Sequence, residues 1–149
     1  MDLLIRERNT RIYTGGRPFN REQPAVVLIH GAGHDHSVWT YQARHLAHRG
    51  YAVVAPDLPG HGASDGPALD SIDSLADWIV DLLDGLGLTR VSLVGHSMGS
   101  LIALAVAGRA AQRIDRLILV GSVAPMPVAP MLIEAARTDR DRAHAMINQ

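Results

Sequence analysis

The stretch that most constrains the fold is residues 91–107, where a Gly-x-Ser-x-Gly motif joins two apolar runs of different character. The first run, 91–94, predicts a strand, and the second, 101–107, has the small apolar residues of a buried helix. Since a strand and helix joined by one sharp turn approach closely, a Cβ at Gly95 or Gly99 would crowd the facing backbone. The pattern predicts that Ser97 lies at the tip of the turn, in a strained conformation, with its hydroxyl exposed at the end of a sheet.

The rest of the chain alternates between strand-like and helix-like segments. We expect a hairpin within 2–20, with strands at 3–5 and 11–13 and a turn at Gly15-Gly16. Continuous apolar runs predict buried parallel strands, and periodic apolar positions predict helices, the first of them capped by Ser37 and the second starting at Ser71. The strands are 25–29, 51–55, 91–94 and 114–120, and the helices are 37–49, 71–86, 98–107 and 131–149. This order predicts an α/β fold with a mostly parallel sheet and helices on both faces.

Composition excludes several classes of function. The chain has 149 residues, 47% of them apolar, and a formal net charge of −1, which suits one soluble domain with no nucleic-acid partner. The absence of cysteine excludes a disulfide framework, a thiol nucleophile and a cysteine metal site. The N-terminus is charged too early for a signal peptide, and no apolar run approaches the ~18 residues of a membrane span. We therefore expect a cytoplasmic protein with no membrane partner.

A second glycine-rich segment follows the apolar run at 25–29 and reads His30-Gly31-Ala32-Gly33-His34. Together with the Gly-x-Ser-x-Gly turn, it resembles the α/β-hydrolase superfamily. The resemblance implies that Ser97 is the nucleophile and that the backbone N–H groups of Ala32 and Met98 form the oxyanion hole. It also implies that a further set of residues lines the substrate cleft, namely Gly31, Gly33, His34, Trp39 and His96.

The resemblance extends to two further segments. Residues 57–64 are similar to the family's turn after its fourth strand, and we interpret this turn as structural, with Ser64 bonding the backbone and His61 packed or solvated. The resemblance divides the chain into residues 1–130, the N-terminal part of the hydrolase core, and residues 131–149, the start of a cap helix.

The partners that a serine nucleophile requires are not evident. A histidine must take the serine proton and a carboxylate must orient that histidine, and in the family both follow the nucleophile. After Ser97 the only histidine is His144, and the acids are Asp115, Glu134, Asp139 and Asp141. Asp115 precedes its strand and so lies at the wrong end of the sheet, and the other three fall in the predicted cap helix. The sequence thus covers only the earlier part of the family pattern.

The other histidines near the motif do not fill this gap. We expect none of His30, His34 and His96 to act as the base. His34-x-His36 lacks a nearby carboxylate cluster, so we expect no metal and no cofactor.

Three functions remain open. The first is a serine hydrolase that acts on a small ester, a thioester or a C–C bond next to a carbonyl; a serine at the turn argues against dehalogenase and epoxide hydrolase chemistry, which use aspartate there. The second is an acyltransferase, because it forms the same acyl-enzyme. The third is a non-catalytic chain that binds a small ligand or a partner polypeptide. We expect the 149 residues alone to be nearly inactive, to expose strand 117–120 as an edge, and to self-associate or pair with a C-terminal half.

Overall fold

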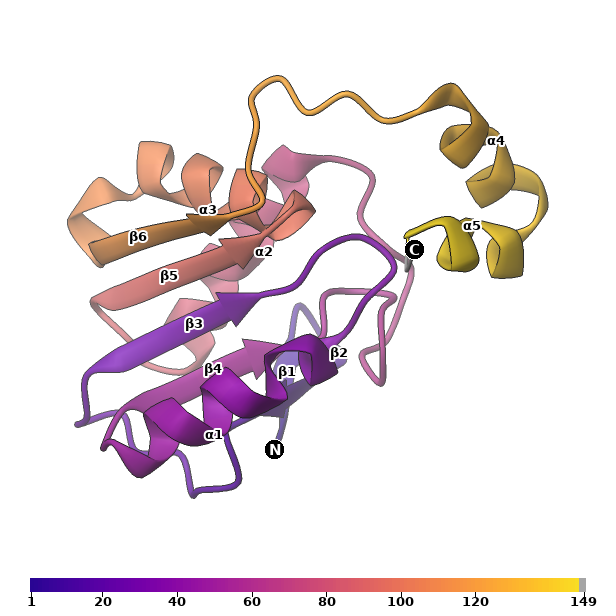
Figure 1. Cartoon of the computed structure of the whole chain (residues 1–149). Helices are drawn as coiled ribbons and strands as arrows, with labels where there is room; N and C mark the ends of the chain where they lie inside the picture. Colours follow the sequence, from indigo (N-terminus) through magenta and orange to yellow (C-terminus); the bar gives the residue numbers. More distant parts are fainter. Residues whose placement is uncertain (148–149) are drawn as a thin grey trace.

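The computed structural model describes residues 1–147, which form a six-stranded mixed sheet in the order β1-β2-β4-β3-β5-β6 (Figure 1). Strands β4, β3, β5 and β6 run parallel, and the antiparallel pair β1 and β2 extends the sheet beyond β4. The strands are β1 Asp2–Ile5, β2 Arg8–Tyr13, β3 Ala25–Ile29, β4 Ala52–Pro56, β5 Val91–His96 and β6 Ile114–Val120. The predicted α/β fold with a mostly parallel sheet is confirmed.

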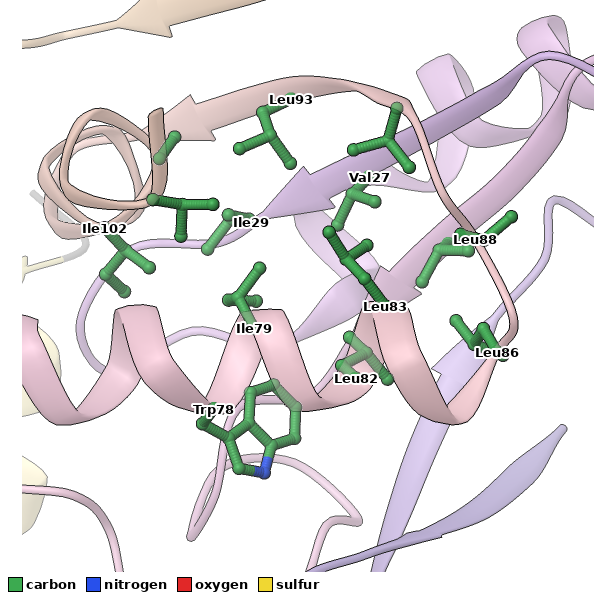
Figure 2. Close-up of a cluster of buried hydrophobic side chains, with 14 of the residues drawn as sticks. Val27, Ile29, Trp78, Ile79, Leu82, Leu83, Leu86, Leu88, Leu93 and Ile102 are labelled. Carbon is green, nitrogen blue, oxygen red and sulfur yellow. The ribbon is translucent and has the colours of Figure 1, made fainter. Parts of the chain in front are cut away.

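Helices cover both faces of this sheet. Alternate side chains of β3 point to opposite layers: Val26 and Leu28 pack toward α1, whereas Val27 and Ile29 pack toward α2 and α3. Figure 2 shows the second layer, where Ile79 and other apolar side chains of α2 face the strands. The helices are α1 Thr40–His48, α2 Ile72–Gly85, α3 Met98–Arg109, α4 Pro130–Thr138 and α5 Arg140–Ile147, with short 3-10 helices η1 His36–Trp39 and η2 Ala111–Arg113.

The N-termini of the first two helical segments test the predicted caps. Ser71 caps α2 as expected, because its hydroxyl accepts a hydrogen bond from the Ser74 amide at 3.1 Å. The predicted cap Ser37 is wrong. The first helical segment begins as η1, and Asp35 caps it by accepting from the Ser37 amide at 2.7 Å. A carboxylate two residues earlier competes effectively with a serine for this position.

The single helix predicted over 131–149 is two helices. The break falls at Asp139, whose backbone is extended (φ −152°, ψ 91°) and whose carboxylate accepts from the Arg142 amide at 3.0 Å. This aspartate ends α4 and caps α5. Residues 148–149 of the predicted helix lie outside the described residues. Figure 1 shows α4 and α5 joined to β6 by an extended segment, 121–129, that leaves the sheet.

Strand β6 forms at the predicted position. The burial that its continuous apolar run predicts is wrong, whereas the expectation that 117–120 form an exposed edge is confirmed. Its outer side chains are exposed, with Ile118 at 48% and Val120 at 42%. The reason is its place in the sheet, since β6 is an edge strand among the described residues. The hairpin β1–β2 also forms, but it turns at Arg6-Glu7 (φ 50° and 63°), while Gly15 and Gly16 make a separate turn after β2.

No helix in residues 1–147 combines the length and apolarity needed to cross a membrane.

Candidate functional site

Ser97 occupies the one-residue turn between β5 and α3, with φ 53° and ψ −122°. Its amide donates to the Val120 carbonyl at 2.9 Å, which extends the ladder between β5 and β6, and its carbonyl accepts from the Ser100 amide at 2.8 Å. The flanking glycines are required as predicted. A Cβ on Gly95 would lie 2.2 Å from the Gly99 oxygen, and one on Gly99 would lie 2.3 Å from the Ile29 oxygen. The crossing of β5, α3 and β3 therefore fixes the serine in place.

Ser97 opens into a cavity of about 680 Å³. Four other residues singled out in the sequence line the same cavity: Ala32, His34, His96 and Met98. Ala32 lies on the loop after β3, and Met98 begins α3. The two backbone segments proposed to supply oxyanion donors thus border one space beside the serine.

The apolar wall of this cavity was not predicted from the sequence. It includes side chains of α2, α3 and α4 together with the segment after β6, among them Ile72, Leu101, Met126, Val128 and Leu132. The sequence signal that could have indicated this wall is the proline-rich run 125–130. It follows a strand of the parallel sheet at the same end of the sheet as Ser97. Ligands of open α/β sheets bind at this end.

The three remaining predicted cleft residues lie outside the lining of this cavity. Gly31 is buried beneath the turn, where an added Cβ would lie 3.2 Å from the Ser97 Cβ. Gly33 lines a neighbouring cavity of about 320 Å³ together with His61 and His144. Trp39 is buried, packs edge-on against His96 with ring centroids 6.4 Å apart, and has an indole N–H with no hydrogen-bond partner. Trp39 therefore packs against His96, which lines the cavity, without lining the cavity itself.

His30 is locked into the loop after β3. Its Nε2 accepts from the Leu58 amide at 3.0 Å, so Nδ1 carries the proton that is donated to the Gly31 carbonyl at 2.8 Å. Burial lowers the pKa of His30 to about 4, which keeps the ring neutral at neutral pH. Both ring nitrogens are occupied, so His30 holds the loop and is not placed to take a proton from Ser97.

His34 and His96 lie in the cavity itself. Their rings meet edge-on with centroids 6.4 Å apart, and Nδ1 of His34 is 2.9 Å from the Ala32 carbonyl, to which it donates. This contact ties His34 to the same loop that carries the Ala32 amide.

The acids that follow Ser97 are not brought to it. Asp115 pairs with Arg90 at 2.6 Å at the beginning of β6, the end of the sheet opposite Ser97, as predicted. Asp139 caps α5, and His144 lines the smaller cavity beside Gly33. Within residues 1–147 no aspartate or glutamate side chain lines the larger cavity.

A cluster of Asp35, His36 and Asp57 corrects the expectation that His36 has no carboxylates near it. Their ligand atoms lie within 4.8 Å of one another. Hydrogen bonds already use the buried Asp57 carboxylate: Oδ1 accepts from the His36 amide at 2.8 Å and ring at 2.7 Å, and Oδ2 accepts from the Ala63 amide at 2.9 Å. We therefore interpret the cluster as a structural hydrogen-bond network that joins the loops after β3 and β4. Ser64 completes it by donating to the Asp57 carbonyl, the backbone bond predicted for it.

A sequence model of the alpha/beta hydrolase fold matches residues 24–143, and the chain belongs to this family. An uncharacterized protein of Mycobacterium tuberculosis is 45% identical over 100 residues, which are 66% of this chain and 29% of that protein. The pimeloyl-[acyl-carrier protein] methyl ester esterase of Nitrosomonas europaea is 38% identical over 99 residues, 66% of this chain and 37% of the esterase.

Among solved structures, the enol-lactonase of Burkholderia xenovorans LB400 superposes with a TM-score of 0.85 and 30% sequence identity. The superposition covers 99% of this chain and 57% of the lactonase. The chain therefore spans less than two thirds of the length of these relatives. Its relatives include hydrolases of several kinds, and its own fold is that of the α/β-hydrolase core.

Proposed function

We propose that this chain carries the nucleophile and oxyanion hole of a serine hydrolase acting on an ester, a thioester or a C–C bond next to a carbonyl. The observation that carries the proposal is Ser97, held at positive φ on the turn between β5 and α3 and opening into the larger cavity. The esterase and lactonase relatives support the same reaction class.

In the proposed reaction, the Ser97 hydroxyl oxygen attacks the substrate carbonyl carbon, and the serine proton passes to a base. The N–H groups of Ala32 and Met98 stabilise the oxyanion; Met98 lies in the first turn of α3, where amides are free of intrahelical partners and the helix dipole favours negative charge. The intermediate then collapses, the bond from the carbonyl carbon to the alcohol, thiol or carbon leaving group breaks, and the leaving group takes up the proton held by the base. Water next attacks the acyl-enzyme, which releases the carboxylic acid and restores the Ser97 hydroxyl. An alternative acceptor in place of water would make the protein an acyltransferase, and product analysis distinguishes the two.

The two components that a serine nucleophile requires, a histidine base and the carboxylate that orients it, are not found as a pair in the larger cavity within residues 1–147, where His34 and His96 lie without an aspartate or glutamate. We propose that a complementary polypeptide supplies them, and that the 149 residues alone retain only the rate due to the oxyanion hole and binding, about 10³-fold over water. The cytoplasmic location predicted from the sequence remains part of this proposal.

Labelling with a fluorophosphonate tests the nucleophile. With the C-terminal half of a full-length relative added in trans to supply the base, mass spectrometry of the digested protein is expected to place the adduct on Ser97, and the Ser97→Ala variant is expected to remain unlabelled. The chain without that half is expected to label far more slowly. Ser122→Ala, which removes an exposed serine just after β6, serves as a control and is expected to label like the parent. Labelling elsewhere, or equal labelling of Ser97→Ala, contradicts the proposal.

Hydrolysis of p-nitrophenyl esters tests the missing base. We expect the chain to be far slower than a full-length relative at equal concentration. A comparable rate that Ser97→Ala abolishes would show that a histidine of this chain is the base, and His34 would be examined first because it lines the cavity.

A further inference from the structure

The lining of the larger cavity is divided by polarity. Its polar side chains among residues 1–147 are His34 on the loop after β3, His96 at the end of β5 and Ser97 on the turn. The rest of the lining includes aliphatic and thioether side chains, with Ile72 from α2, Leu101 from α3, and Met126 and Leu132 beyond β6. The reacting group and two histidines are thus the polar side chains in the described part of an otherwise apolar lining.

No lysine, arginine, aspartate or glutamate in the described part of the chain lines this cavity. A carboxylate carried by the far end of an acyl group would lose hydration there without gaining an ionic partner, which is strongly unfavourable. An alkyl end would instead bury apolar surface, at about a fourfold gain in affinity for each methylene that is fully buried. The volume of about 680 Å³ lies within the range common for small-molecule sites.

We propose that the site takes an uncharged aliphatic acyl group, whose carbonyl lies at Ser97 and whose tail lies along Leu101, Met126 and Leu132, and that it rejects acyl groups ending in a carboxylate. This inference rests on the proposed function for the position of the carbonyl. The selectivity follows from the apolar lining of the larger cavity, and binding measurements test it without catalysis.

Two esters that differ only at the far end of the acyl chain test the selectivity. Methyl hexanoate ends in a methyl group, and monomethyl adipate ends in a carboxylate that is ionised at neutral pH. Titration of each into the Ser97→Ala protein, followed by NMR, gives dissociation constants with no turnover. We expect methyl hexanoate to bind at least about tenfold more tightly than monomethyl adipate, and more tightly than methyl butanoate.

Two exposed valines on the segment after β6 give a matched pair of variants. Val128 is 52% exposed and lines the cavity, whereas Val123 is 54% exposed and does not. In the Ser97→Ala background, Val128→Arg adds a cation at the wall and is expected to reduce the preference for methyl hexanoate to below about threefold. Val123→Arg is expected to leave the preference unchanged.

The outcomes separate this inference from the proposed function. Equal affinities for the two six-carbon esters, no saturable binding of either, or equal effects of the two arginine variants would overturn the inference. A clear preference in a protein whose Ser97 resists fluorophosphonate would retain the ligand class and remove the nucleophile. Labelling of Ser97 without the preference for methyl hexanoate would retain the nucleophile and overturn the ligand class.

Discussion

Ser97 holds the strain of the turn in its own backbone. A φ of 53° with a ψ of −122° is a conformation that only glycine adopts readily. Alanine keeps the Cβ and therefore the strain, whereas glycine relieves it. We expect Ser97→Gly to be more stable than Ser97→Ala by about 1 kcal/mol, although glycine also gains entropy in the unfolded chain. Denaturant unfolding of the two variants measures the difference, and a more stable Ser97→Ala would contradict the strain.

Gly99 and Gly108 make a second comparison, within the same helix. A Cβ on Gly99 would overlap the backbone of β3, whereas one on Gly108 meets nothing within 4 Å. We expect Gly99→Ala to lose about 3 kcal/mol or fail to fold, and Gly108→Ala to gain about 0.5–1 kcal/mol from helix propensity. Soluble yield and the free energy of unfolding test both. Similar values for the two variants would mean that the close crossing is not present in solution.

His30 predicts a pH dependence of stability. Its pKa falls from 6.5 to about 4 on folding because burial disfavours the charged ring. Between these values the unfolded chain binds a proton that the folded protein does not, so this contribution is complete above pH 6.5 and is lost as the pH falls toward 4. At about pH 4.5 the loss is about 2 kcal/mol.

Unfolding of the parent and of His30→Gln at both ends of this range isolates the effect. The variant is expected to be less stable at neutral pH but to lose about 2 kcal/mol less on acidification. His48→Gln, an exposed histidine of α1, is the control and is expected to follow the parent. Parallel curves for His30→Gln and the parent would show that His30 protonates without cost in the folded state.

At the level of elements, two arginines connect α2 with the end of α3 and with η2, and their surroundings differ. Arg109 pairs with Asp73 and Asp77 of α2 in exposed positions and also donates to the exposed Asp73 carbonyl at 2.9 Å. Arg113 also pairs with an aspartate, Asp84, but it is largely covered and donates to the carbonyls of Leu88 and Thr89 as well. Exposed pairs contribute little and are screened by salt, whereas a covered arginine that satisfies carbonyls contributes more.

We therefore expect unequal losses on truncation. Arg109→Met should cost about 0.5 kcal/mol, and the cost should vanish in 1 M salt. Arg113→Met should cost about 1–2 kcal/mol, and most of it should persist in salt because two carbonyls lose their donor. Unfolding at low and high ionic strength checks both. A salt-insensitive effect of Arg109→Met larger than that of Arg113→Met would contradict this assignment.

Elements were predictable where local chemistry decides them. Ser71 caps α2, the glycines fix the turn at Ser97, and continuous apolar runs become β3 and β4. Prediction failed where two local sequence signals compete for one position, or where a neighbouring element determines the outcome. Asp35 outcompetes Ser37 as a cap, and Asp139 breaks a helix whose periodicity runs on.

The candidate site likewise has a part that local sequence predicts and a part that it does not. The sequence identifies the residues beside Ser97, because two glycine-bearing motifs follow strands that lie side by side as β3 and β5. The apolar wall comes from Ile72, Leu132 and other residues of distant segments with no motif of their own. Only the packing of those segments shows that they face the serine.

For the whole molecule, the exposed edge strand β6 is the dominant feature. Its apolar run 117–120 is that of a strand buried on both faces, yet only β5 pairs with it among residues 1–147. Unpaired backbone groups beside exposed apolar side chains favour pairing with another strand. Because this run lies at an exposed edge, its apolar composition predicts an interaction with another chain, as expected from the sequence.

We expect the purified chain to self-associate in a concentration-dependent manner through β6, and Ile118→Lys to shift it toward monomer, because a lysine on an edge strand opposes edge-to-edge pairing. Sedimentation velocity over a range of concentrations measures the shift. Tyr41→Lys is the matched control, because Tyr41 is an exposed apolar residue (86%) of α1, away from β6. A monomeric parent at all concentrations, or equal shifts in the two variants, would show that β6 does not mediate association.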